Sequence, residues 1–509
     1  MNAFDNNKYL KLQAEKISER ITKFNDKLYL EFGGKIFDDY HASRVLPGFE
    51  IDSKVQMLFG LRDKVEIVIC INANDIQISK MRGDNGISYE DEVFRMIESF
   101  RKMDLYVGSV VVTKYAKQPR VEIFKRKLKY LGVPVFFHYP IEGYPFNTEK
   151  IVSDEGFGKN DYIKTTRSLI VVTAPGPGSG KMATCLSQLY HENKRGIHAG
   201  YAKYETFPVW NLPLKHPVNL AYEAATVDLN DVNMIDPFHL NKYGTLAVNY
   251  NRDVEVYPIL EALFKKIYGE TPYYSPTDMG VNMAGFCIVD EEKVKEACKQ
   301  EVIRRYYETK CRVRLGKATE QEVEKINLIM AQLSTNTSER KTVEAALNKE
   351  KEKKVPAFAL ELKDGTIITG KQSKLLTATS AAILNSIKYL AGVKDQLKLL
   401  SPNIIEPICK LKENIYKDMI IIADSGSTKT DWCVVNHGKQ VKRITTEGTN
   451  PFFQTEEEIS QVVKDKLMPH LDGVKIDAVY FYGAGCAFPE KNEIVHNAIY
   501  RHIPVTIEV

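Results

Sequence analysis

The sequence lacks several features that would place the protein in a special compartment. Its first residues, MNAFDNNKYLKLQAEK, are polar and contain no apolar core of a signal peptide. No stretch approaches the roughly 20 continuous apolar residues that a membrane-spanning helix needs. The eight cysteines are scattered, and none belongs to a Cys-x-x-Cys pair. We therefore expect a cytoplasmic protein with reduced thiols, without disulfides and without structural zinc.

An excess of charge of one sign is also lacking. The 70 basic and 66 acidic residues leave a net charge of +4. This near-balance gives no electrostatic reason to expect nucleic acid or an anionic membrane as a partner. Apolar residues make up 44% and charged residues 27% of the 509 residues, which is typical of a globular protein with a real core. The length corresponds to about three domains, at roughly 100–200 residues each.

Alternating strand and helix patterns fill the first half of the chain. Apolar, β-branched runs predict four strands, at 64–71, 105–113, 133–138 and 169–173. Amphipathic patterns between them predict helices, for example at 89–103 and 120–131. Because continuous apolar strands spaced by helices are typical of sheets covered on both faces, we expect an α/β fold with a mainly parallel sheet layered with helices.

The rest of the chain changes pattern twice. We expect an α/β domain with a phosphate-loop-like motif at 1–270, a helical region at 271–350, a small α/β unit at 351–416 and a further segment at 417–509. In the helical region, Thr319 and Glu322 are spaced as a capping box. In the small unit, the dipeptide at 364–365, Asp-Gly, separates two apolar runs and predicts a hairpin.

The stretch VVTAPGPGSGKMATCL, residues 171–186, resembles a phosphate-binding loop between a strand and a helix. Such loops direct backbone N–H groups at an anion from the start of a helix, and a lysine neutralises charge. The usual pattern is G-x-x-x-x-G-K-[ST]. Here a proline, Pro175, replaces the first glycine, and Met182 replaces the Ser/Thr that would hold magnesium. The candidate cofactor-binding residues are Gly176, Gly178, Ser179, Gly180, Lys181 and Thr184.

The departures from that pattern leave two interpretations open. Pro175 and Pro177 lack N–H groups, so the loop has fewer donors than an ordinary ATPase loop. We expect the loop to bind a phosphate or another anion, and we do not expect the standard magnesium-dependent hydrolysis of ATP. The alternative is a rigid turn between strand and helix with an exposed lysine.

Polar residues cluster where the predicted strands end. Ligands of open parallel sheets bind at the carboxyl ends of strands. The candidate substrate-binding residues Asn72, Asn74 and Asp75 follow the strand at 64–71, and Arg82, Gly83 and Asp84 come shortly after. Earlier in the chain, the stretch EFGGKIFDDYHASRVLPG supplies further polar groups, among them Lys35, His41 and Arg44.

A second polar stretch, TVDLNDVNMIDPFH, supplies the candidate catalytic residues Asp228, Asp231, Asp236 and His239. Carboxylates at this spacing could act as acid and base or hold a metal ion. Asp and Asn are also the usual residues of turns and helix caps, so a structural role is the alternative for each of them.

Several long blocks carry a family resemblance over about residues 1–416. They are CINANDIQISKMRGDNGISY, APGPGSGKMATCLSQLYHE, YETFPVWNLPLKHPVNLAYEAATVDLNDVNMIDPFH and VNMAGFCIVD. In this order they closely resemble the uncharacterised bacterial proteins of domain-of-unknown-function family 1846. The resemblance implies a cytosolic α/β protein with a helical insertion and a smaller α/β unit, and it implies no established activity.

A different resemblance covers residues 418–509. The stretch MIIIADSGSTKTDW at 419–432 is similar to the first half-domain of actin-like sugar kinases, in particular the N-acetylglucosamine kinase and BadF-type ATPase group. That resemblance implies that Asn450 approaches a sugar. It also implies that a set of hairpin residues faces the phosphates of ATP with magnesium: Asp424, Gly426, Ser427, Thr428 and Thr430.

The kinase-like segment covers only half of such an enzyme, because the sequence ends at PVTIEV, before the segment that carries the base aspartate of that group. A truncated or fused gene product without chemistry of its own is the alternative for this segment.

We therefore expect a protein that binds a nucleotide or another phosphorylated small molecule at residues 174–181, with the reaction unassigned and with ATP and Mg as candidate cofactors. The alternatives are an ATP-dependent sugar kinase that acts through the C-terminal segment and a non-catalytic assembly protein. A homo-oligomer is compatible with the sequence, and no nucleic-acid or membrane partner is expected.

Overall fold

The computed structural model describes residues 2–25, 27–34, 36–37, 39–83, 86–394, 397, 401–415, 419–471 and 474–509. Lys35 and Asp84 lie outside the described residues. The chain forms two compact units, Met1–Glu339 and Arg340–Val509, which are described separately. The four-part division expected from the sequence stays a prediction. No helix in the described ranges is long and apolar enough to cross a membrane, and the eight cysteines form no disulfide.

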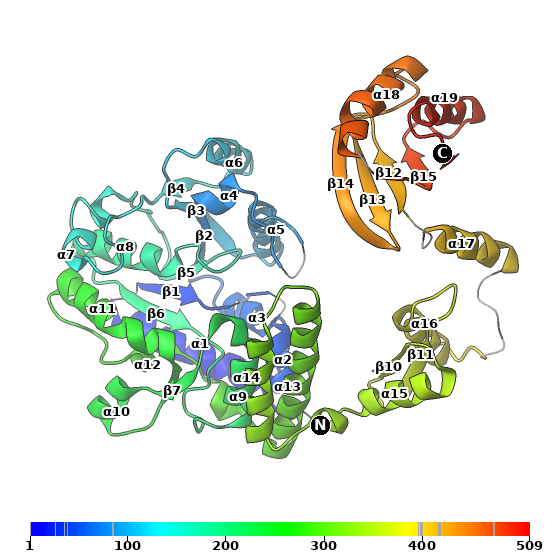
Figure 1. The fold of residues 1–509 in the computed structure, drawn as a ribbon. Coiled ribbons are helices and arrows are strands. Elements are labelled where there is room, and N and C mark those ends of the chain that lie inside the picture. The colour runs from blue at the N-terminus through cyan, green and yellow to red at the C-terminus, as the bar shows by residue number, and fades with distance from the viewer. Residues whose placement is uncertain are drawn as a thin grey trace. The chain divides into compact units, whose positions relative to one another are not determined.

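The first unit is built on a seven-stranded sheet in the order β4-β3-β2-β5-β1-β6-β9, in which every neighbouring pair is parallel (Figure 1). Strand β2 is buried along its whole length, as expected for an apolar strand covered on both faces. The predicted parallel α/β fold is therefore confirmed. The strands are β1 (Leu28–Phe32), β2 (Val65–Asn72), β3 (Tyr106–Thr113), β4 (Val135–Phe137), β5 (Leu169–Thr173), β6 (Gly200–Tyr204) and β9 (Gly280–Val281).

Helices cover the two faces of this sheet. On one face, Tyr29 of β1 donates a hydrogen bond to Glu192 of α8 at 2.7 Å. On the other, Phe32 of β1 stacks on Tyr204, whose hydroxyl lies 2.6 Å from that of Tyr9 in α1. The helices are α1 (Asn6–Lys23), α2 (Tyr40–Val45), α3 (Ser53–Gly60), α4 (Ala73–Gln77), α5 (Tyr89–Lys102), α6 (Pro119–Tyr130), α7 (Thr148–Ile151), α8 (Lys181–Asn193), α9 (Pro217–Ala225), α10 (Pro237–Tyr243), α11 (Asn251–Tyr268) and α12 (Pro276–Met279).

The strand order creates a reversal in the middle of the sheet. After β2 the chain proceeds outward through β3 and β4, and it then returns to place β5 between β2 and β1. The next connection crosses β1 to reach β6 on the other side. The connections that leave β2 and β5 therefore diverge, and such a switch point is where open parallel sheets bind ligands.

A second core in this unit lies among α2, α9, α13 (Glu291–Arg314) and α14 (Glu320–Gln332). The predicted capping box of Thr319 and Glu322 is present at the start of α14. An antiparallel pair, β7 (Asn233–Ile235) and β8 (Val248–Tyr250), lies apart from the main sheet.

The second unit contains two small sheets. The predicted hairpin consists of β10 (Ala357–Glu361) and β11 (Ile367–Lys371), and it packs with α15 (Lys341–Lys353) and α16 (Ala378–Leu390). Helix α17 (Pro402–Ile415) follows. The five-stranded sheet has the order β14-β13-β12-β15-β16, with bounds β12 (Met419–Ser425), β13 (Lys429–Asn436), β14 (Lys439–Glu447), β15 (Ala478–Gly483) and β16 (Thr506–Glu508). Helices α18 (Glu456–Val462) and α19 (Pro489–Tyr500) pack together beside it.

We expect Gly200→Ala to destabilise the first unit. A Cβ atom at Gly200 would lie 2.1 Å from Cδ2 of Phe24, which is 1% exposed. Overpacking of this kind costs about 1–3 kcal/mol of unfolding free energy. Gly60→Ala is the control, since its Cβ would meet no atom within 4 Å. Equal urea midpoints for the two variants would contradict the packing at Gly200.

Candidate functional site

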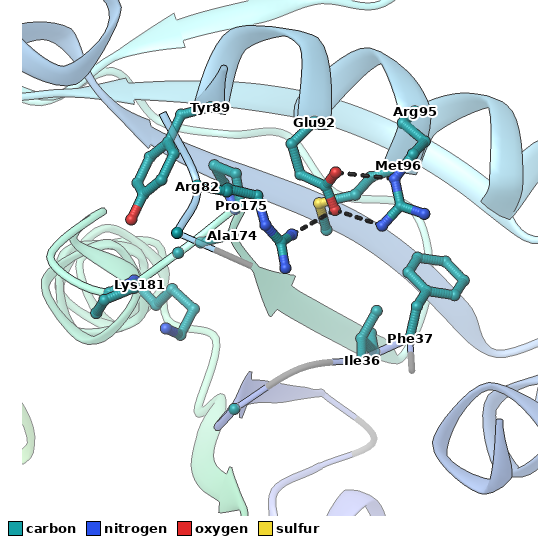
Figure 2. Close-up of a pocket in the computed structure, with 14 residues that line it drawn as sticks. Ile36, Phe37, Arg82, Tyr89, Glu92, Arg95, Met96, Ala174, Pro175 and Lys181 are labelled. Carbon is teal, nitrogen blue, oxygen red and sulfur yellow. Dashed lines mark hydrogen bonds and ion pairs between the residues drawn. The ribbon is translucent and has the colours of Figure 1, made fainter. Parts of the chain in front are cut away.

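A cavity of about 350 Å³ lies at the carboxyl ends of β1, β5 and β2, at the switch point of the sheet (Figure 2). Three segments line it, each of which follows one of these strands. They contribute Gly34, Ile36 and Phe37 after β1, Arg82, Gly83, Tyr89, Glu92, Arg95 and Met96 after β2, and Ala174, Pro175, Gly176, Pro177 and Lys181 after β5.

The β5–α8 loop, residues 174–180, is held by side chains that donate to its carbonyl groups. The Ser179 hydroxyl donates to the carbonyl of Gly176 at 2.9 Å. The Thr113 hydroxyl donates to the carbonyl of Ser179 at 2.8 Å, and the Asn72 amide donates to that of Gly178 at 3.4 Å. Asn72 and Thr113 lie at the ends of the neighbouring strands β2 and β3, and Ser179 belongs to the loop itself. Together these three donors hold the loop in its conformation.

Two glycines give the loop its shape at the start of α8. Gly178 and Gly180 have φ angles of +76° and +86°, in the left-handed region that favours glycine. Gly180 is the N-cap of α8, and Lys181 is its first residue. In the described part of the chain, the N–H groups of Gly176 and of 178–183 donate to no protein atom. The loop therefore presents unpaired donors where a helix begins.

Two further polar groups at this end of the cavity have no protein partner among the described residues. The Lys181 side chain lines the cavity and makes no hydrogen bond or ion pair there. Tyr89 is 5% exposed, and its hydroxyl makes no hydrogen bond. That hydroxyl lies against the loop, since a Cβ atom at Gly176 would be 2.3 Å from it. Figure 2 shows both side chains at the end of the cavity that the loop closes.

Charged side chains form the opposite wall. Glu92, whose side chain is 2% exposed, contacts Arg82 at 2.5 Å and binds Arg95 through two hydrogen bonds of 2.8 Å. Arg82 and Arg95 are thus paired, and Lys181 is the lining cation for which the described residues provide no partner. An ammonium group at the start of a helix favours an anionic ligand.

Thr184, a predicted cofactor-binding residue within α8, does not face the cavity. It is fully buried, and the Cys70 thiol donates to its hydroxyl at 3.4 Å. Burial raises the pKa of Cys70 to about 12, so the thiol stays protonated. Thr184 does not line the cavity with Gly176 and Lys181.

A separate group of buried charges lies at the end of β6. Lys203 forms ion pairs with Glu205, at 2.7 Å, and with Asp253, and the Tyr250 hydroxyl donates to Glu205 at 2.9 Å. Burial lowers the pKa of Lys203, but the two carboxylates outweigh it and the net shift is upward. Burial also raises the pKa of Glu205. The group holds one ammonium against two carboxylates, and the charge of Asp253 adds to burial in raising the pKa of Glu205.

The three predicted substrate residues lie beside the loop and do not line the cavity. Asn72 caps α4 and holds the carbonyl of Gly178. Asn74 is exposed and accepts a hydrogen bond from Gln118 at 2.9 Å. Asp75 is buried and pairs with Lys80 at 3.4 Å. Their role in substrate binding stays a prediction, and Asn72 has in addition a positioning role.

The candidate catalytic carboxylates are not brought together around the cavity. Asp228 pairs with Arg312 at 3.6 Å, and Asp231 pairs with Arg252 at 3.2 Å. In the described ranges, no three His, Cys, Asp or Glu side chains are grouped so that they could hold a metal ion.

Asp236 and His239 have partners of their own at α10. Asp236 is fully buried and caps α10, because it accepts hydrogen bonds from the N–H groups of Phe238 and His239, both at 3.0 Å. The other oxygen of Asp236 accepts from Thr277 at 2.6 Å. Nδ1 of His239 lies 3.2 Å from the Ser275 hydroxyl. A catalytic role for these residues stays a prediction.

In the C-terminal sheet, the candidate phosphate-facing residues divide into two groups. Asp424, Ser427 and Thr428 are exposed, and Gly426 is half-buried. Thr430 is fully buried, and its hydroxyl lies 2.7 Å from that of Ser425.

The predicted sugar residue of that segment, Asn450, is also buried. It donates to the Ser427 hydroxyl at 2.9 Å and so holds the turn between β12 and β13.

Sequence reasoning missed Tyr89, Glu92, Arg95 and Met96, although it placed them in one helix. The signal was present, because Glu92 lies on the same helical face as Tyr89, Val93 and Met96, all of them buried. A carboxylate inside an apolar stripe needs a charged partner. Arg82 and Arg95 are these partners, and together with Glu92 they line one wall of the cavity.

Comparison with known proteins identifies relatives of unknown activity. The model of the domain of unknown function DUF1846, N-terminal, matches residues 2–334, and that of its C-terminal domain matches residues 338–424. A UPF0371 protein of Streptococcus pyogenes serotype M5 (strain Manfredo) is 57% identical over 412 residues, which cover 81% of this chain and 83% of that protein. A UPF0371 protein of Streptococcus sanguinis (strain SK36) is 56% identical over 412 residues, which again cover 81% of this chain and 83% of that protein.

Among the solved structures that match this chain, one is similar over a short segment. It is a putative N-acetylglucosamine kinase from Porphyromonas gingivalis, 44% identical in sequence, and the match covers 18% of this chain and 33% of that chain. The TM-score is 0.17, which supports no conclusion about the fold or activity of this chain.

We expect Gly176→Ala to destabilise the protein only while Tyr89 is present. The three atoms nearest to the added Cβ all belong to the Tyr89 side chain, so the overpacking cost of about 1–3 kcal/mol should disappear in a Tyr89→Ala background. Urea unfolding of the two single variants and the double variant measures this coupling. Gly83→Ala, on the same cavity but in open space, is the control. Additive costs would show that Tyr89 does not lie against the loop.

Proposed function

The chain belongs to the family of the domain of unknown function DUF1846, and we propose that it binds a phosphorylated small molecule with the phosphate at the start of α8. The observation that carries this proposal is a set of donors without protein partners at one end of the cavity. They are the N–H groups of the β5–α8 loop, the Lys181 ammonium and the Tyr89 hydroxyl.

The chemistry of these groups suits a phosphate. A helix N-terminus offers N–H groups and the positive end of the helix dipole, and phosphate oxygens accept from both amides and ammonium groups. Tyr89 adds a neutral donor whose position is set by packing against Gly176. The Lys181 ammonium also attracts an anion toward the loop.

The same residues do not fit magnesium-dependent hydrolysis of a nucleoside triphosphate. Met182 follows the lysine where the usual loop has a hydroxyl that holds magnesium. Thr184, the next hydroxyl, is buried against Cys70. We therefore assign binding and positioning of a phosphate to this loop, and the reaction that follows stays unassigned.

We expect Lys181→Ala to weaken the binding of phosphate esters by about 10- to 100-fold, since hydrogen bonds to charged groups contribute roughly 1.5–3 kcal/mol. Tyr89→Phe removes one neutral donor and should weaken binding by a smaller factor. Isothermal titration with sugar phosphates and nucleotides measures both effects.

Lys194→Ala is the matched control, because Lys194 lies at the other end of α8 and pairs with the exposed Asp154. Equal affinities of the Lys181→Ala variant and the control would refute the proposed site. The same conclusion would follow if no phosphorylated compound bound the unaltered protein at millimolar concentration.

A further inference from the structure

Apolar side chains line part of the cavity away from Lys181, beside the Arg82–Glu92–Arg95 group. Ile36 and Met96 are almost fully buried there, at 4% and 2% exposure. Phe37 is half-buried, and its ring packs against that of Phe100 with a centroid distance of 5.0 Å. Figure 2 shows Ile36, Phe37 and Met96 grouped on the side opposite Lys181 and Tyr89. The far wall therefore combines apolar side chains with the Arg82–Glu92–Arg95 group, whereas the loop end carries the donors without partners among the described residues.

We infer that the ligand is a nucleoside monophosphate, with its phosphate on the β5–α8 loop and its base against Phe37 and Met96. This inference rests on the proposed function. An aromatic ring is favourable on this wall for two reasons. It stacks on or beside a phenylalanine ring with a geometry that aliphatic groups cannot match. Methionine sulfur also makes favourable contacts with aromatic rings.

The volume of the cavity sets the size of the ligand. Pockets for drug-sized molecules have volumes of about 300–1,000 Å³. A cavity of about 350 Å³ lies at the lower end of this range and suits one nucleotide rather than a dinucleotide. A bare sugar phosphate would occupy the loop end and leave the half-buried Phe37 ring uncovered, so it would gain less from burial.

Lys181 is the cation that faces the proposed phosphate, and a phosphomonoester carries a charge of roughly −1.5 to −2 at pH 7. Glu92 holds both guanidinium groups in place, and an oriented guanidinium plane is itself a surface on which a base stacks.

The test compares four ligands on the full chain: AMP, UMP, ribose 5-phosphate and adenosine. Isothermal titration should show at least one of the two nucleotides binding 10-fold or more tightly than ribose 5-phosphate, with adenosine weaker than both nucleotides. Phe37→Ala should reduce that advantage to within about threefold and leave ribose 5-phosphate unchanged. Lys181→Ala should weaken all three phosphate esters by a similar factor.

Phe146→Ala is the matched control, because Phe146 is 78% exposed and does not line the cavity. Ribose 5-phosphate binding as tightly as both nucleotides would overturn the inference about the base and leave the phosphate site intact. So would a nucleotide advantage that Phe37→Ala does not change while the variant keeps its melting temperature. If no phosphate ester binds the unaltered protein, the proposed function fails as well.

Discussion

The orientation of the peptide planes in the β5–α8 loop is the constraint on which the site depends. In a planar trans peptide, the carbonyl and the following N–H point in opposite directions. Asn72 holds the carbonyl of Gly178, and Thr113 holds that of Ser179. The N–H groups of Ser179 and Gly180 are thereby turned away from these two side chains. The loop keeps its amides available because its carbonyls are occupied.

The sheet topology brings the donors of this arrangement together. Asn72 and Thr113 end β2 and β3, and the loop follows β5, which pairs directly with β2. Strand β5 takes this place only because the chain returns to the centre of the sheet after β4. The same return places α5 and the start of α8 on neighbouring connections, and the cavity lies between them. The proposed phosphate site therefore depends on strand order as much as on the glycine-rich sequence.

The local parts of this structure could be predicted from the sequence. The strands at 64–71 and 169–173 follow from unbroken apolar runs, and β2 and β5 are found there within one residue. The capping box at Thr319 follows from spacing over a single helical turn. The position of Lys181 on a cavity at the carboxyl end of the sheet also agrees with its place between a strand and a helix.

The long-range parts could not be predicted. Nothing local in the sequence shows that the hydroxyl of Tyr89 meets Gly176, since the contact depends on the packing of α5 against β2 and β3. The carboxylates of 228–236, whose catalytic role stays a prediction, show the same dependence on the fold. Their dense spacing suggested a shared site, but Asp236 caps a helix and Asp231 pairs with Arg252. Asp is a common residue in both settings, and only the fold distinguishes them.

The two prolines of the loop explain why one phosphate group suits this site better than a chain of phosphates. Ordinary phosphate-binding loops wrap several phosphates with successive N–H groups. Pro175 and Pro177 line the cavity but carry no N–H, so the available amides are those of Gly176 and of 178–183. Proline also fixes φ, so the loop loses less conformational entropy when a ligand binds. The loop thus has fewer donors in a more rigid arrangement, which agrees with the single phosphate group of the proposed ligand.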